Sequence, residues 1–399
     1  MGKVYCRVYQ GAFKIGMNFI PWKMPESIEG PGIIKELPAF IKEKGNKKVL
    51  VVTDKVLNRD LNMLDSLYKA LDKEKLGYAV YDGVMPNPTD VNVEEGLKIF
   101  NENNCDCIIA FGGGSAMDCA KGIGARAVKK NKSIRKLHGL FKVLHRIPTI
   151  YAVPTTAGTG SETTIAAVIT LAEDHHKITV NDISLIPKYA VFDPEITVGL
   201  PPHLTSTTGM DALCHAVESY TNKTYNTKLE NELAIKAVKL IDENLYKCYK
   251  DGKDIKARQN MQKAAFYAGR AFTRGCVGYV HAVGHTLSGL YGMPHGLTMS
   301  IILPHVMRQF GPAVHKRLAQ LADVIGIKGN TDAEKSDKFI AWIEDLNKKM
   351  DIPNKIEQIQ EKDYDQIIQW ASKEANPLYP VPVVWGKEDF VKLLNTIKA

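Results

Sequence analysis

Residues 107–124, CIIAFGGGSAMDCAKGIG, decide the fold of the first half of the chain. The stretch runs from a continuous apolar segment, typical of a buried parallel strand, through three glycines into a helix that begins at or beside Ser115. Such a junction offers free backbone N–H groups and the positive end of a helix dipole to a phosphate. Glycine allows the phosphate oxygens to approach closely because it has no Cβ. The stretch predicts an α/β domain with a phosphate-binding turn.

Strand-like and helix-like segments alternate on both sides of this junction. Short β-branched or aromatic runs lie at residues 48–53, 78–81, 149–153 and 189–192. Helix-length segments, such as residues 66–76 and 91–103, lie between them. Repetition of strand and helix predicts right-handed crossovers and a parallel sheet.

A hairpin attached to this sheet is expected where residues 164–171 and 177–180 flank the polar turn 173–176. His175 and His176 at its tip raise the question of a metal. Solvent exposure is the favoured interpretation, because adjacent residues in such a turn point in different directions.

The second half of the chain changes character after Asp193-Pro194 and Pro201-Pro202. Apolar residues now recur at helical spacing, which predicts helices at residues 212–220, 229–246, 259–274, 313–325, 332–348 and 363–374. A chain of 399 residues is long enough for two domains. We therefore expect an α/β dinucleotide-binding domain at residues 1–197 and an all-helical metal-binding and catalytic domain at residues 198–399.

Composition excludes several classes of protein. The net charge of +8, from 52 basic and 44 acidic residues, is spread along the chain, so no nucleic-acid partner is expected. Seven cysteines without a CxxC pair suit a reducing cytoplasm. The chain opens without a signal-peptide pattern, and the apolar run at residues 15–22 is far below the roughly 20 residues that span a bilayer. We expect a cytoplasmic protein without a membrane partner.

The glycine-rich turn differs from the Rossmann fingerprint, which follows the first strand. Here the glycines follow the third predicted strand, and the acidic candidate Asp54 ends the first. A second small-polar loop, PTTAGTGSETT at residues 154–164, follows the next strand. Two such loops at the carboxyl edge of one sheet favour ligand binding over a tight turn without a ligand. Lys121, further into the helix, either adds positive charge there or faces solvent.

A second constellation lies in the helical half. Asp211 and His215 stand four residues apart on a predicted helix, His281 and His285 repeat that spacing, and His295 follows in a loop. One carboxylate with several imidazoles suits Fe²⁺ or Zn²⁺. A single pair of this kind is more often a helix cap or a surface ion pair, but the grouping favours metal. Spacing alone does not decide which of the five residues are ligands.

The motifs, taken together, resemble the iron-containing, group III alcohol dehydrogenases along nearly the whole chain. They occur as VTDK at 52–55, PNPT at 86–89, GGGS at 112–115, PTTAGTGSE at 154–162, DALCHAVE at 211–218 and HAVGHTLSGLYGMPHG at 281–296. The resemblance implies a dehydroquinate synthase-like fold and a NAD-dependent, metal-containing alcohol dehydrogenase, expected as a homodimer. Its partner would be a small-molecule alcohol or aldehyde.

The resemblance also implies roles for single residues. The metal ligands would be Asp211, His215, His281 and His295, with Fe²⁺ as the metal and Zn²⁺ as the alternative. His285 would stand near the nicotinamide and substrate as a proton relay or positioning residue, unless its role is structural. Phe272 would line the substrate pocket, although core packing fits it equally well.

For the cofactor, the resemblance places Asp54 at the adenosine ribose and Thr155 and Thr156 at the adenine side. The phosphates and nearby groups would meet Asn87, Gly112, Gly113, Gly114 and Ser115, and the set extends to Thr164 and Lys177. A carboxylate at the ribose repels a 2′-phosphate, so NAD is expected rather than NADP. The alternative for Asp54 is that it caps the following turn.

Three rival functions stay open at this point: a glycerol dehydrogenase-like enzyme, a dehydroquinate synthase-like enzyme, and an inactive dinucleotide-binding protein. The histidine-rich motifs argue against the first two, whose relatives carry different metal sets. The intact candidate ligands argue against the third. The sequence does not identify the alcohol.

Overall fold

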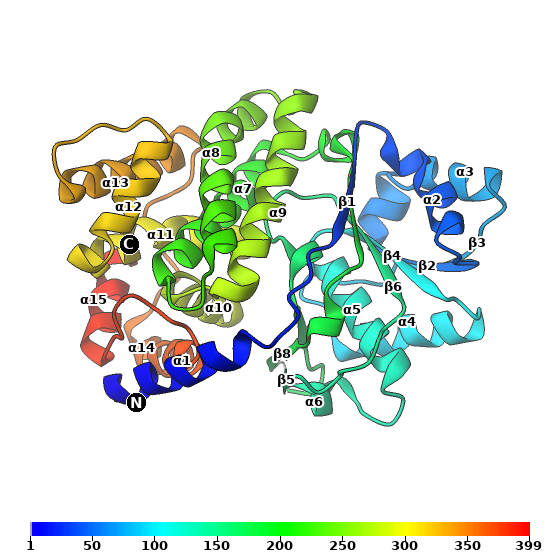
Figure 1. The fold of residues 1–399 in the computed structure, drawn as a ribbon, viewed down its shortest axis with the longest axis horizontal. Helices are drawn as coiled ribbons and strands as arrows, with labels where there is room; N and C mark the ends of the chain where they lie inside the picture. The colour runs from blue at the N-terminus through cyan, green and yellow to red at the C-terminus, as the bar shows by residue number, and fades with distance from the viewer. Residues whose placement is uncertain (1, 175) are drawn as a thin grey trace. The chain divides into compact units, whose positions relative to one another are not determined.

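A computed structural model describes every residue of the chain except Met1 and His175 (Figure 1). His175, one of the two histidines predicted at a hairpin tip, lies outside the described residues. The chain forms two compact units, one of Trp22–Gly199 and one of Leu200–Ala399 together with the segment up to Pro21. The N-terminal segment therefore groups with the helical half, whereas the sequence placed it in the α/β domain.

The unit Trp22–Gly199 is built on a six-stranded sheet in the order β1-β9-β6-β4-β2-β3, in which every neighbouring pair is parallel. Its strands are β1 (Glu26–Glu29), β2 (Lys48–Val52), β3 (Gly77–Tyr81), β4 (Cys107–Gly112), β6 (Thr149–Pro154) and β9 (Tyr189–Phe192). The five strands predicted from apolar runs are all present. The edge strand β1, of sequence ESIE, carries no such run and was not predicted.

Helices cover both faces of this sheet. They are α2 (Leu37–Glu43), α3 (Asp65–Lys73), α4 (Asp90–Glu102), α5 (Gly114–Val128) and the short α6 (Ile134–Leu137). Alternate residues of β2 serve different cores: Leu50 packs with residues of α4 and α5, and Val51 with residues of α2 and α3. Burial on both faces explains why the strands read as continuous apolar runs.

The predicted hairpin is present as β7 (Ala166–Thr170) and β8 (Lys177–Asn181), which pair antiparallel. It belongs to a separate three-stranded sheet with β5 (Gly139–Leu140), rather than to the main sheet. The reason is packing, since Ile169 and Ile178 join the core formed by α4 and α5.

The helical unit contains α7 (Pro202–Asn222), α8 (Lys228–Lys250), α9 (Ile255–Gly275), α10 (Tyr279–Tyr291), α11 (His295–Phe310), α12 (His315–Val324), α13 (Asp332–Lys349), α14 (Tyr364–Ala375) and α15 (Lys387–Ile397). The six helices predicted from spacing correspond to α7, α8, α9, α12, α13 and α14. Helices α10 and α11, which were not predicted, carry the remaining histidine candidates. No helix in the described part of the chain is both long and apolar enough to cross a bilayer.

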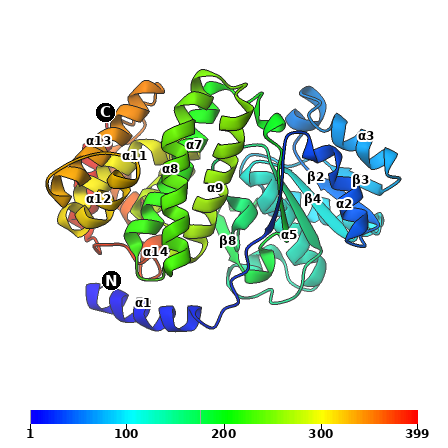
Figure 2. The ribbon, with the colours of Figure 1, turned by 45° about the horizontal axis from the view of Figure 1, so that its top comes forward.

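Helix α1 (Lys3–Met17) also belongs to this unit (Figure 2). Its inner side buries Cys6, Gln10 and Met17. The Gln10 amide Nε2 donates hydrogen bonds to the carbonyls of Pro377 (3.0 Å) and Tyr379 (2.9 Å). These contacts attach the N-terminal helix to the helical unit and explain its departure from the predicted division.

Candidate metal centre and cofactor loops

Three helices bring one carboxylate and three imidazoles to one point. Asp211 and His215 lie one turn apart on α7, His281 lies on α10, and His295 is the first residue of α11. The Asp211 Oδ1 atom is 3.3 Å from Nε2 of His295, 3.6 Å from Nε2 of His281 and 4.0 Å from Nε2 of His215. The structure therefore gathers all four residues that the resemblance assigned to the metal.

Unpartnered polar atoms at this point fit a cation. Among the described residues, the buried Asp211 Oδ1 and His281 Nε2 have no hydrogen-bond partner. A buried polar atom without a partner costs about 1–3 kcal/mol. Ligand atoms of Asp211, His281 and His295 all lie within 4.8 Å of one another. Such oxygen and nitrogen donors suit Zn²⁺ or Fe²⁺.

The electrostatics of the cluster also suit a cation. Burial opposes ionisation of Asp211, yet the imidazoles of His215 and His295 hold its pKa well below the usual value. Burial lowers the pKa of His215 to about 3, so this imidazole is neutral at neutral pH. Burial also opposes protonation of His281, but the Glu218 carboxylate and Asp211 outweigh it and raise the pKa of His281 to about 9. A metal would therefore displace a proton from His281.

Glu218 is a residue that the sequence interpretation missed. Its Oε2 atom lies 2.5 Å from His281 Nδ1, and its Oε1 atom accepts a hydrogen bond of 2.8 Å from the Val280 amide. A carboxylate that holds Nδ1–H leaves Nε2 free as a ligand atom. A signal was present, because Glu218 lies two helical turns after Asp211 on the same face.

His285 takes a different position from the other histidines. Its Nδ1 atom lies 2.8 Å from Glu374 Oε1 rather than near Asp211. Its ring stacks beside that of His295, with centroids 5.1 Å apart. Phe272 stacks on the His215 ring at 4.1 Å between centroids, so the packing role that the sequence left open is present.

The glycine-rich turn lies between β4 and α5, as expected. Gly113 precedes the helix, and Gly114 and Ser115 lie in its first turn. Gly112 has a φ of +152°, and a Cβ there would lie 2.7 Å from the Cβ of Ala116. The Thr155 amide donates to the Gly112 carbonyl at 3.0 Å, which joins the second loop to the first, and Thr156 follows in that second loop.

The other cofactor candidates already have protein partners. Asp54 Oδ1 accepts a hydrogen bond of 2.9 Å from the Leu57 amide, so it caps the turn that follows β2. Asn87 has a φ of +57°, and its Oδ1 accepts from Lys177 Nζ at 2.9 Å. Thr164 Oγ1 accepts from Lys121 Nζ at 2.8 Å.

Comparison with known proteins gives the family. A model described as iron-containing alcohol dehydrogenase matches residues 25–194, and the C-terminal model of the Fe-containing alcohol dehydrogenase family matches residues 205–398. A 1,3-propanediol dehydrogenase of Klebsiella pneumoniae is 37% identical over 352 residues, which cover 87% of this chain and 90% of that protein. The chain belongs to the iron-containing alcohol dehydrogenase family.

Two further relatives agree with this membership. The NAD-dependent methanol dehydrogenase of Bacillus methanolicus is 38% identical over 338 residues, which cover 84% of this chain and 87% of that protein. The solved structure of an alcohol dehydrogenase from Oenococcus oeni matches with a TM-score of 0.89 and 34% identity, and covers 94% of this chain and 99% of that one. The predicted family, fold class and type of oxidoreductase are thus confirmed.

The structure excludes one of the two roles that the sequence left open for Lys121. Its side chain is fully buried, so it does not face solvent. Its Nζ donates to the Ser161 carbonyl (2.7 Å), the Ser161 hydroxyl (3.0 Å), Thr164 Oγ1 (2.8 Å) and the Ala166 carbonyl (2.8 Å). Burial lowers the pKa of Lys121 to about 8. The lysine therefore ties α5 to the second loop.

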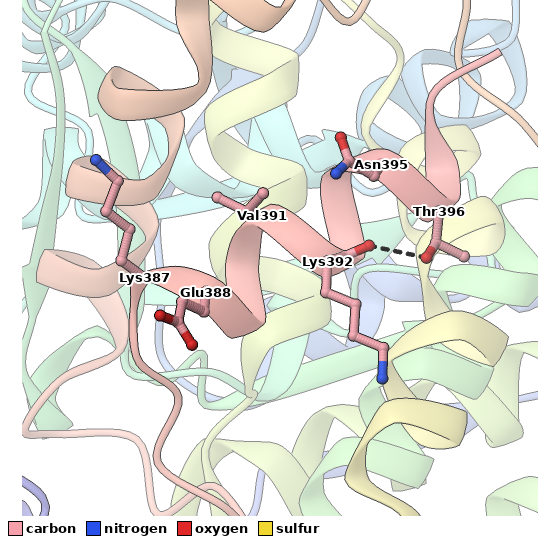
Figure 3. A pocket seen from close by; sticks show the side chains of 6 residues that line it. All are labelled: Lys387, Glu388, Val391, Lys392, Asn395 and Thr396. Atoms are coloured by element: carbon pink, nitrogen blue, oxygen red, sulfur yellow. Dashed lines mark hydrogen bonds between the residues drawn. The ribbon is translucent and has the colours of Figure 1, made fainter.

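A surface hollow beside α15 lies apart from these candidates in the sequence. It is lined by Lys387, Glu388, Val391, Lys392, Asn395 and Thr396 (Figure 3). All six residues come from one helix, and none is a candidate for metal or cofactor.

Proposed function

We propose that this chain is a NAD-dependent alcohol dehydrogenase that interconverts an alcohol and its aldehyde or ketone at a metal held by Asp211, His215, His281 and His295. The observation that carries the proposal is the buried, unpartnered Asp211 Oδ1 with three imidazole nitrogens within 4.0 Å. Fe²⁺ is the proposed metal, in keeping with the family, and Zn²⁺ is the alternative that the same donors would accept.

The metal, when bound, would supply Lewis acidity toward the alcohol or carbonyl oxygen. Asp211 contributes the negative charge that retains a cation in a buried site. Glu218 keeps His281 Nδ1 protonated and so leaves Nε2 as the donor atom. We assign His285 to relay the alcohol proton or to hold the substrate, since its Nε2 has no hydrogen-bond partner in the described part of the chain and its side chain is 37% exposed.

The α/β unit is proposed to bind the dinucleotide. The free N–H groups at the start of α5 would hold its phosphates. The turn there consists of Gly112, Gly113, Gly114 and Ser115, and Asn87 and Lys177 are proposed to contact the phosphates or neighbouring groups. Thr155, Thr156 and Thr164 complete the proposed set. Asp54 at the ribose would favour NAD over NADP by like-charge repulsion of a 2′-phosphate.

Relatives suggest the type of substrate. Two of them are a methanol dehydrogenase and a 1,3-propanediol dehydrogenase, so small primary alcohols and diols head the panel to be tested. We also propose a homodimer in the cytoplasm, in line with the resemblance.

The test is formation of NADH from a panel of alcohols by metal-free protein reloaded separately with Fe²⁺ and Zn²⁺. We expect turnover that depends on metal and on alcohol, and its loss in His295→Ala. The matched control is His203→Ala, an exposed histidine at the start of α7. Tight NADH binding without turnover for any alcohol or metal would instead support the inactive dinucleotide-binding alternative.

A further inference from the structure

His285 is held by a carboxylate from another helix. Its Nδ1 atom lies 2.8 Å from Oε1 of Glu374, near the end of α14. An ionised carboxylate only accepts hydrogen bonds, so Nδ1 must carry the proton. In the neutral ring, Nε2 then carries the lone pair. The pair thus fixes both the ring orientation and the atom that can accept a proton from a substrate.

Glu374 is itself held in place. Tyr379 donates its hydroxyl proton to the same Oε1 atom at 3.1 Å. Burial raises the pKa of Tyr379 well above its usual value, so the hydroxyl stays protonated and remains a donor. A single carboxylate oxygen therefore receives both His285 and Tyr379, and its rotation is limited from two sides.

The N-terminal helix supports this arrangement from behind. Gln10, which is 1% exposed, donates from Nε2 to the carbonyl of Tyr379 and to that of Pro377. Arg7 donates to Gln10 Oε1 at 2.8 Å, which fixes the amide with its NH₂ group toward those carbonyls. Helix α1 thus anchors the backbone that carries Tyr379.

We propose that Glu374 is a positioning residue for His285, supported through Tyr379 by Gln10 of the N-terminal helix. The assignment of turnover to His285 rests on the proposed function. The positioning itself rests on the contacts from His285 to Glu374, Tyr379 and Gln10. The proposal gives the N-terminal helix α1 a supporting role at the proposed active site.

The kinetic test compares Glu374→Leu with Glu374→Gln. Leucine removes the acceptor, whereas the glutamine oxygen can receive both hydrogen bonds at the same place. We expect kcat to fall by about 10-fold to 100-fold in the leucine variant, by analogy with carboxylates that orient metal-binding histidines, and to be largely restored in the glutamine variant. Metal content and the KM for NAD should stay at wild-type values in both. Glu388→Leu, an exposed carboxylate on α15, is the matched control.

Tyr379→Phe and Gln10→Leu extend the comparison outward. Each removes a donor without touching His285, so we expect a smaller loss of kcat in each than in Glu374→Leu. A leucine variant with wild-type kcat would overturn the proposal. So would a glutamine variant as impaired as the leucine variant, because the role would then be charge rather than position.

A spectroscopic test reads the positioning without any turnover. The zinc-loaded protein, labelled with ¹⁵N-histidine, is suitable because Zn²⁺ has a filled d shell. With the His285 signals assigned by their loss in His285→Ala, we expect the Nδ1–H form in wild type and in Glu374→Gln, and a mixture of both ring forms in Glu374→Leu. An Nε2–H form in wild type would overturn the proposal. If no alcohol is oxidised by wild type, the proposed function fails, and these spectra still decide the role of Glu374.

Discussion

Replacement of Glu218 by glutamine should weaken metal binding without removing any proposed ligand. The carboxylate uses its two oxygens separately, one for His281 Nδ1 and the other for the Val280 amide. An amide has only one acceptor oxygen. If that oxygen faces Val280, the amide NH₂ faces His281 and forces Nδ1 to become the acceptor, which moves the ring proton to Nε2. If it faces His281, the buried Val280 N–H loses its partner.

Metal binding requires the second arrangement, because Nε2 must carry no proton when it holds the metal. Binding therefore costs the Val280 hydrogen bond that the metal-free variant can keep. A buried group left without its hydrogen bond costs about 1–3 kcal/mol. Loss of a partner that orients a metal-binding histidine weakens metal affinity about 10-fold to 100-fold, or roughly 1.4–2.8 kcal/mol. The two values agree, so we expect the dissociation constant for Zn²⁺ to rise within that range in Glu218→Gln.

The assay is competition for Zn²⁺ against a chelator of known affinity, with thermal unfolding recorded for the metal-free protein. Glu230→Gln is the matched control, because Glu230 is also buried in the helical unit but accepts from Thr227 and lies beside Arg270. It should lose stability and keep its metal affinity. A folded Glu218→Gln protein that binds Zn²⁺ as tightly as wild type would refute the reasoning.

Four further outcomes are expected. His295→Ala should lose bound metal, measured by elemental analysis, and keep its affinity for NADH, measured by fluorescence titration; retention of both metal and activity would contradict the ligand assignment. Gly112→Ala should weaken NADH binding by at least about tenfold, because the new Cβ would meet Ala116 at 2.7 Å and the φ of +152° suits only glycine; unchanged NADH affinity would exclude the turn as a phosphate site. Asp54→Gly should raise the ratio of kcat/KM with NADP to that with NAD, and an unchanged ratio would leave Asp54 with its capping role alone. In the metal-free protein the pKa of His281, about 9 when folded and 6.5 when unfolded, implies stability that is present below pH 6.5 and lost as the pH rises through about 9; urea unfolding that shows no such loss would contradict it.

The α/β half could be predicted well because its strands are buried on both faces. Runs such as CIIAF at residues 107–111 are apolar at every position, so they stand out in the sequence as strands, and the glycines after β4 mark the turn. β1 escaped prediction because ESIE is itself an edge strand, paired among the described strands only with β9, and three of its four residues are exposed. Helix α1 escaped because its buried face includes the polar Gln10, whose partners lie about 370 residues away.

The candidate site could be predicted in its members and only partly in its arrangement. The same spacing of four residues separates Asp211 from His215 and His281 from His285. Spacing therefore cannot tell which pair supplies two metal ligands and which supplies one. Tertiary contacts separate them, because Glu218 holds His281 toward Asp211 and Glu374 holds His285 elsewhere. Partners on another helix leave no local pattern in the sequence. The role of Lys121 stayed open in the sequence for the same reason, since its four acceptors lie 40 or more residues further along.

Charge balance adds a constraint on the metal itself. Asp211 and Glu218 are the buried carboxylates at the cluster, and a buried charge without compensation is costly. In the metal-free protein, the raised pKa of His281 supplies one compensating proton at neutral pH. A divalent cation that displaced this proton would offset the charges of both carboxylates, whereas a trivalent ion would leave a buried positive charge. By this count of charges, the same residues favour a divalent ion such as Fe²⁺ or Zn²⁺ over a trivalent one.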